Sequence, residues 1–295
     1  MRVKFGTYYA YWEREWDADF IPYCKKVASL GFDILEIAAG GLVEKSGAEQ
    51  KALQQAAIDN DITLTACIGL PEKYNVSSAD ETVRRAGIEY LKRIMDAMHH
   101  TGIKILGGII YAYWPCDYSK PVDKKQAWDM AVRSMREAAQ TAADLDILLV
   151  METVNRFEQY IINSAKEAVE FVKEIGSEHA KVMLDCFHMN IEEDFLGDAI
   201  RETGDYLGHF HIGEANRKVP GKGHMPWDEL GQALRDIHYA GGVVMEPFVK
   251  EGGTVGSNIK VWRDLSDNAD AARMDSDIRE SLVFLKEKFL GGAKE

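Results

Sequence analysis

Short apolar segments alternate with longer amphipathic segments along most of the chain. The apolar segments carry hydrophobic residues on both faces and many β-branched side chains, a pattern typical of parallel strands that are buried on both sides. The pattern predicts eight such strands, at residues 3–9, 32–38, 62–68, 103–110, 147–152, 180–185, 207–212 and 242–247.

The segments between these strands have the periodicity of surface helices. In residues 163–176, for example, Val169 and Val172 fall on one helical face while charged residues occupy the other. Gly31 and Gly102 stand at points where the periodic pattern stops, as expected of glycines that end helices.

Eight strands alternating with helices in one series, without a linker, predict an α/β protein made of a single (β/α)8 TIM barrel domain over residues 1–295. The alternative is a doubly wound open sheet, which usually carries a Gly-rich phosphate-binding turn after its first strand. The sequence GTYYAYW at residues 6–12 is not such a turn. The Gly-rich residues 248–272 are predicted to form a long loop on the face where barrels hold their active sites.

Composition restricts the expected partners. With 35 Lys and Arg against 48 Asp and Glu, the net charge is −13, so neither nucleic acid nor an anionic membrane is expected to bind. The four cysteines form no CxxC pair, which indicates reduced thiols in the cytoplasm. Residues 1–12 lack the apolar region of a signal peptide, and no window approaches 18 apolar residues. A soluble cytoplasmic protein is therefore expected.

Four consecutive predicted strands end in a polar side chain: Glu152, Asp185, His211 and Glu246. A lone acid at a strand end is more often a helix cap, but strand ends of a barrel converge on one rim, so these four are expected to meet. Three carboxylates buried together require a compensating cation. Oxygen ligands with one imidazole suit Mn²⁺, Mg²⁺ or Co²⁺ better than a thiolate-type zinc site, so the sequence predicts a divalent metal centre.

Other polar residues follow these strands. Glu158 and His188 lie a few residues beyond Glu152 and Asp185, and Arg217 lies beyond His211, either as a fork for a substrate oxygen or in a solvated loop. His209 shares a strand face with His211 but lies deeper, so we expect a hydrogen-bonded histidine behind the metal site. Two further acids are predicted to lie in the first turn of a helix, namely Glu192 and Glu193.

A metal flanked by carboxylates suits proton abstraction next to a carbonyl group. Strands 5 and 8 are roughly 135° apart around an eight-stranded ring, so Glu152 and Glu246 could approach a substrate from opposite faces. Two bases on opposite faces permit epimerisation, whereas one base moving a proton along one face permits isomerisation.

Long segments of the chain resemble the ketose 3-epimerases, the D-tagatose 3-epimerase and D-psicose (D-allulose) 3-epimerase family. They include YYAYWEREW, NRFEQYIINSA, KVMLDCFHMNIEED, GHFHIGEANRKVPGKG and VVMEPFVKEGGTVGSNIKVWRDLS. The resemblance runs nearly end to end and implies a xylose-isomerase-like barrel that forms a homodimer or homotetramer.

The resemblance also implies roles for individual residues. One divalent metal, usually Mn²⁺ or Co²⁺, would be held by the four strand-end residues. Glu152 and Glu246 would act as the acid–base pair at C3 of a free ketose, through a cis-enediolate. The substrate would be bound by Glu158, His188, Arg217, Tyr8 and Trp114.

Some positions depart from the family pattern, namely the loop 69–76, Ile109, Cys186 and Ile212. They leave the preferred ketose open, because pocket walls discriminate between similar substrates. Three other functions remain alternatives: an aldose–ketose isomerase on the same barrel, a metal-dependent phosphodiesterase of the endonuclease IV type and a non-catalytic sugar-binding protein. More histidine ligands and a basic face would favour the phosphodiesterase, and a signal segment would favour the binding protein.

Overall fold

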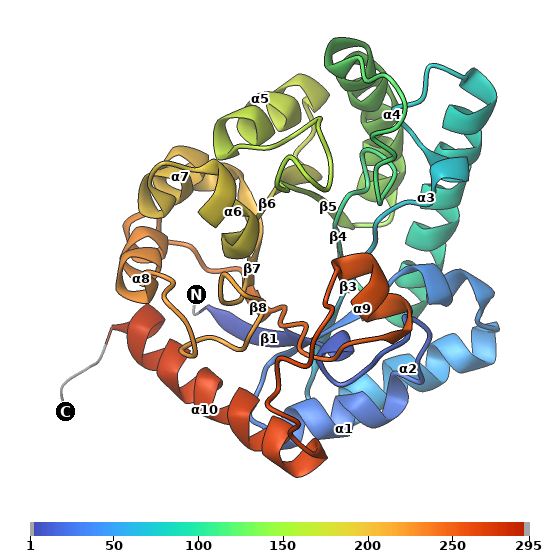
Figure 1. The fold of residues 1–295 in the computed structure, drawn as a ribbon. Coiled ribbons are helices and arrows are strands. Elements are labelled where there is room, and N and C mark those ends of the chain that lie inside the picture. Colours follow the sequence, from blue (N-terminus) through green and yellow to red (C-terminus); the bar gives the residue numbers. More distant parts are fainter. Residues whose placement is uncertain (1–2, 292–295) are drawn as a thin grey trace.

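The computed structural model describes residues 3–291 and shows a closed barrel of eight parallel strands surrounded by helices (Figure 1). Each strand pairs with the next along the chain, and β1 pairs with β8 to close the ring. The strands are β1 (Lys4–Tyr8), β2 (Ile34–Ala38), β3 (Thr63–Cys67), β4 (Ile105–Gly107), β5 (Leu148–Glu152), β6 (Ala180–Asp185), β7 (Leu207–Ile212) and β8 (Gly242–Met245). Closure confirms the predicted barrel and excludes the open sheet.

At least one helix follows each strand, either directly or after a loop. They are α1 (Ile21–Ser29), α2 (Gly47–Asp59), α3 (Glu81–Thr101), α4 (Lys124–Asp144), α5 (Ala165–Ile175), α6 (Cys186–Glu192), α7 (Leu196–Thr203), α8 (Trp227–Asp236), α9 (Gly253–Ile259) and α10 (Ala271–Leu290). Four short 3-10 segments join them: η1 (Tyr9–Tyr11), η2 (Gly40–Glu44), η3 (Glu72–Tyr74) and η4 (Gly204–Tyr206). No helix within residues 3–291 is both long and apolar enough to span a bilayer.

Helix α5 shows how local sequence sets these boundaries. The Ser164 side chain accepts a hydrogen bond from the backbone N–H of Glu167 and so caps the first turn. Val169 and Val172 are buried on the face that packs inward, as their spacing predicted. Gly176 ends the helix with φ of 73°, a left-handed conformation that suits glycine.

Strand register brings the polar strand ends to one rim. Asp185 pairs with His211 across β6 and β7. Glu152 is the last residue of β5, and Glu246 follows β8 directly, where its backbone N–H donates to the carbonyl oxygen of Ile212 at 2.8 Å. Because parallel strands all run the same way, these side chains meet at the carboxyl end of the barrel.

Two local predictions were wrong. Glu192 is the last residue of α6 and Glu193 its C-cap, so neither lies in a first helical turn. Both carboxylates instead join neighbouring loops: Glu192 forms an ion pair with Arg156 at 2.7 Å, and Glu193 accepts from the backbone N–H of Ala165 at the start of α5. Residues 248–272 are likewise not all loop, because they contain α9.

Candidate active site

The four polar strand-end residues form one buried cluster. A ligand atom from each of Glu152, Asp185, His211 and Glu246 lies within 4.8 Å of every other, and all four side chains are buried. Burial, reinforced by the neighbouring Glu246 carboxylate, raises the pKa of Glu152 well above its usual range. A cation among these groups would offset the repulsion between the carboxylates, and the donor set matches a hard divalent metal.

A further buried carboxylate, Glu36 on β2, fixes the orientation of His211. Its two oxygens bind two imidazoles: one pairs closely with Nε2 of His211, and the other lies 2.9 Å from Nε2 of His209. His209 is thus a buried hydrogen-bonded histidine, as predicted. Burial alone would raise the pKa of Glu36, but His211 and His209 outweigh it and hold that pKa below its usual range.

The contact with Glu36 determines which nitrogen of His211 is free to bind a metal. An ionised carboxylate only accepts hydrogen bonds, so Nε2 of His211 carries the proton that it donates to Glu36. Nδ1 is buried, has no hydrogen-bond partner among residues 3–291 and lies 3.4 Å from Oε1 of Glu246. His211 thus has one nitrogen bound by the Glu36 carboxylate and a second, unpartnered nitrogen near the other three carboxylates. This is the geometry expected of a histidine that binds a metal and is oriented by a carboxylate behind it.

His188, on α6, lies beside this cluster. Its Nε2 is 3.8 Å from Oε1 of Glu152 and 3.7 Å from Oδ2 of Asp185, while its Nδ1 is 2.8 Å from Nδ2 of Asn155. Burial lowers the pKa of His188 to about 3, so the ring is neutral near pH 7. Glu158 lies 3.9 Å from the same ring and accepts from the indole N–H of Trp114 at 3.0 Å.

Arg217 is buried, which rules out the solvated-loop interpretation. One guanidinium nitrogen, Nη1, donates to Asp185 at 3.2 Å and to Glu246 at 2.9 Å. The guanidinium carbon lies 3.6 Å from the ring centre of Phe187, close enough for a cation–π contact. The Nε–H is a buried donor without a partner in the part of the chain that the structure describes.

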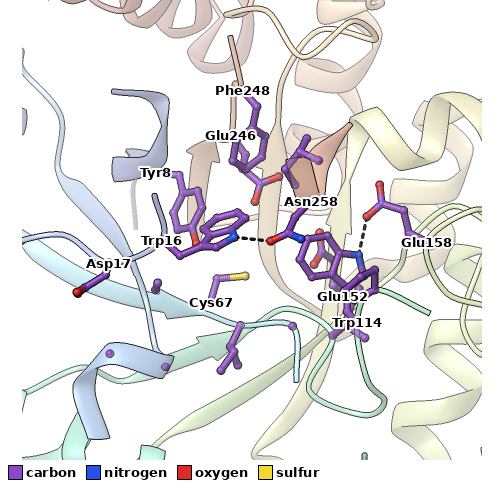
Figure 2. Close-up of a pocket in the computed structure, with 18 of the residues that line it drawn as sticks. Tyr8, Trp16, Asp17, Cys67, Trp114, Glu152, Glu158, Glu246, Phe248 and Asn258 are labelled. Carbon is purple, nitrogen blue, oxygen red and sulfur yellow. Dashed lines mark hydrogen bonds between the residues drawn. The ribbon is translucent and has the colours of Figure 1, made fainter. Parts of the chain in front are cut away.

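These groups open into a cavity of about 600 Å³ at the carboxyl end of the barrel. Figure 2 shows Glu152 and Glu246 at this cavity among aromatic side chains. Tyr8 and Trp114 line it, as the resemblance implied, together with Trp16 and Phe248. The indole N–H of Trp16 donates to Asn258 of α9 at 2.8 Å, so α9 fixes part of the rim.

Several residues of this site were not identified from the sequence. Glu36 lies in the middle of β2, where an isolated acid gives no signal, and Asn155, Trp16 and Phe248 lacked a distinctive pattern. The structure also accounts for one departure from the family pattern, because the buried Cys186 thiol lies 3.1 Å from the carbonyl oxygen of Gly213 and is its hydrogen-bond donor. Ile109 lines the cavity, and Ile212 is fully buried.

Comparison with known proteins agrees with this geometry. The family model of the xylose isomerase-like TIM barrels matches residues 24–274. A D-psicose 3-epimerase of Agrobacterium fabrum is 54% identical over 282 residues, which are 96% of this chain and 98% of the relative. A D-psicose 3-epimerase of Ruminiclostridium cellulolyticum is 50% identical over 282 residues, which are 96% of each chain.

Solved structures extend the agreement to the whole fold. A crystal structure of D-psicose 3-epimerase in the presence of D-fructose superposes with a TM-score of 0.97 at 53% identity, covering 98% of this chain and 100% of that one. A D-psicose 3-epimerase with D-tagatose from Clostridium cellulolyticum H10 superposes with a TM-score of 0.96 at 49% identity, covering 97% and 99%. The chain therefore belongs to the ketose 3-epimerases, a family of enzymes within the xylose isomerase-like TIM barrels.

Proposed function

We propose that this enzyme inverts C3 of free ketoses, interconverting pairs such as D-fructose with D-psicose and D-tagatose with D-sorbose. The observation that carries the proposal is a pair of buried carboxylates, Glu152 after β5 and Glu246 after β8, that line one cavity. Relatives at 50–54% identity named D-psicose 3-epimerase, and related structures with D-fructose and D-tagatose, support this substrate class.

We propose that one divalent metal, Mn²⁺ by preference and Co²⁺ or Mg²⁺ as substitutes, is held by Glu152, Asp185, His211 and Glu246. The buried Nδ1 of His211, without a partner and close to the carboxylates, supports this assignment. When bound, the ion would polarise the substrate oxygens and so lower the barrier to removing a proton from the neighbouring carbon.

The remaining polar groups would orient the ketose. Glu158 accepts hydrogen bonds from hydroxyl groups, while the Arg217 guanidinium and the Nε2–H of His188 donate to the oxygens around C1 to C3. The aromatic side chains of Tyr8 and Trp114 would pack against the carbon skeleton and exclude water from the reacting carbon.

The two glutamates would then exchange protons with C3. One removes the C3 proton from one face, and the other, in its protonated form, returns a proton to the opposite face. Because the two carboxyl groups swap protonation states during a turnover, the same pair serves the reverse reaction.

The test follows the fate of the carbon-bound proton. The purified enzyme is stripped of metal, resupplied with Mn²⁺ or Co²⁺, and given D-fructose, D-psicose and D-tagatose in D₂O. Deuterium at C3 of a C3-inverted product is the expected result. Deuterium at C1 with an aldose product would support the isomerase instead, and no metal-dependent turnover of any ketose would refute both.

The roles of the two glutamates have their own test. Glu246→Gln and Glu152→Gln should each lower kcat by roughly a thousandfold or more, since each variant lacks one of the two proton carriers. Near-normal turnover by either variant would contradict the two-base assignment.

A further inference from the structure

We propose that the same site also epimerises ketoses that carry a further neutral sugar unit on their C6 end, because the cavity continues past the space a hexulose fills. This inference rests on the proposed function, since it uses the same proton transfer at C3. The C3–H bond breaks on one face and forms on the other, so no further reactant is required.

The cavity is larger than a hexulose. The cavity holds about 600 Å³. A hexulose has six carbon and six oxygen atoms, and even at one liquid-water volume per atom it would fill no more than roughly 360 Å³. Roughly 240 Å³ or more is left over, which is space for a second ring.

The candidate metal ligands come from β5 to β8, and the rest of the cavity lies across the mouth beside β1 to β4 and the loops that follow them. A ketose that places C1 to C3 at the ligands would therefore extend its other end in that direction. That side is lined by Tyr8, Ala38 and Cys67, and beyond them by Gly40 and Gly41 at the start of η2. The leftover space therefore adjoins the C6 end of the substrate.

Two glycines, Gly40 and Gly41, form part of the cavity wall at this end. A Cβ atom placed on Gly41 would have no heavy atom within 4 Å, and one placed on Gly40 would first meet Tyr90 at 3.5 Å. A second cavity of about 480 Å³ lies alongside and shares Asp17, Lys45 and Glu49 with the first. A sugar unit beyond C6 would thus find open space beside these two glycines.

The charges at this end select a neutral substituent. The part of the cavity next to η2 is lined by one cation, Lys45, and by three carboxylates, which are Asp17, Glu44 and Glu49. The formal charge of this part is therefore 1 − 3 = −2. Carboxylates accept hydrogen bonds from hydroxyl groups, and they repel phosphates and carboxylic acids. A hexosyl group fits this lining better than a phosphate does.

The test uses 6-O-α-D-glucosyl-D-fructose, D-fructose and D-fructose 6-phosphate as separate substrates of the metal-loaded enzyme in D₂O. We expect deuterium at C3 of both neutral ketoses, with kcat/KM for the disaccharide at least roughly tenfold above that for the phosphate. Gly41→Leu, which adds a bulky side chain at a glycine that lines the cavity, should lower the ratio of kcat/KM for the disaccharide to that for D-fructose by roughly tenfold or more. The matched control is Gly47→Leu, at an exposed glycine that also has no heavy atom within 4 Å of an added Cβ and does not line the cavity.

The outcomes separate this inference from the proposed function. Turnover of D-fructose without turnover of the disaccharide overturns the inference alone, as does a Gly41→Leu variant with an unchanged ratio. Equal turnover of D-fructose 6-phosphate and the disaccharide overturns the restriction to neutral substituents. Turnover of none of the three refutes the proposed function itself.

Discussion

The amide of Asn155 determines which nitrogen of His188 carries the proton. Its Oδ1 accepts from the backbone N–H of Phe157 at 2.9 Å, so its Nδ2 faces Nδ1 of His188 at 2.8 Å. An amide nitrogen only donates, and therefore Nδ1 is the unprotonated nitrogen and Nε2 carries the hydrogen. The Nε2–H is then directed towards Glu152 and Asp185, where the ketose oxygens would lie.

This relationship predicts the behaviour of two Asn155 variants. Asn155→Ala leaves the ring without its outer partner and should lower kcat/KM by roughly 10- to 100-fold. Asn155→Asp replaces a donor with an acceptor and should place a proton on Nδ1. Imidazole ¹⁵N NMR of His188 reads the protonated nitrogen directly, and Asn190→Asp, an exposed change on α6, is the matched control. A wild-type signal with the proton on Nδ1 would disprove this assignment.

Glu36 should matter for metal affinity although it does not belong to the four-residue cluster. Glu36→Gln can still accept one hydrogen bond but no longer offers a charged oxygen to each of His209 and His211. We expect Mn²⁺ affinity to fall by roughly 10- to 100-fold, measured by calorimetric titration of the metal-free protein. Glu81→Gln, an exposed change on α3, should leave the affinity unaltered. Equal affinities for the Glu36 variant and the wild type would show that His211 needs no outer carboxylate.

Metal removal should also destabilise the fold. Four buried ligands, three of them acidic, lose their common counter-charge when a chelator takes the ion away. At a free Mn²⁺ concentration of 100 times Kd, binding contributes about 2.7 kcal/mol, which corresponds to a rise in Tm of roughly 4 °C. A calorimetric scan with and without Mn²⁺ measures the shift. In Asp185→Asn the shift should shrink markedly, and an undiminished shift there would place the stabilising ion elsewhere.

The sequence predicted the barrel and the strand-end cluster because both depend on local patterns that repeat. An apolar strand that stops at an acid is visible in one segment, and the closed ring then brings Glu152, Asp185, His211 and Glu246 together. Contacts across the ring have no such signature. Glu36 is separated from His209 by 173 residues along the chain, and only barrel closure places them 2.9 Å apart.

The prediction for the two acids after β6, Glu192 and Glu193, was wrong for a different reason. The helix dipole favours acidic side chains at the start of a helix, so charge alone placed this pair in a first turn. In the structure β6 passes directly into α6, because the Asp185 side chain accepts from the backbone N–H of Phe187 and caps the helix. The helix therefore begins before Glu192 and Glu193, which fall at its end.

Glu214 provides a test of how the Arg217 loop is held. This fully buried carboxylate accepts from the backbone N–H of Gly221 at 2.7 Å, the backbone N–H of Met225 at 3.2 Å and the indole N–H of Trp227 at 2.9 Å. Glu214→Ala leaves three donors without an acceptor, two of them buried, and should lower the free energy of unfolding by about 2 kcal/mol or more, measured by urea denaturation.

The same change should also weaken substrate binding, because the backbone N–H of Arg217 donates to the carbonyl oxygen of Glu214 at 2.8 Å and the loop positions the guanidinium. KM for D-fructose is therefore expected to rise together with the loss of stability. Glu229→Ala, in the first turn of α8, is a milder comparison because that carboxylate accepts only from the backbone N–H of Gly197 among the described contacts. A Glu214 variant as stable as this comparison would mean that water replaces the lost carboxylate and that the loop is held by its backbone alone.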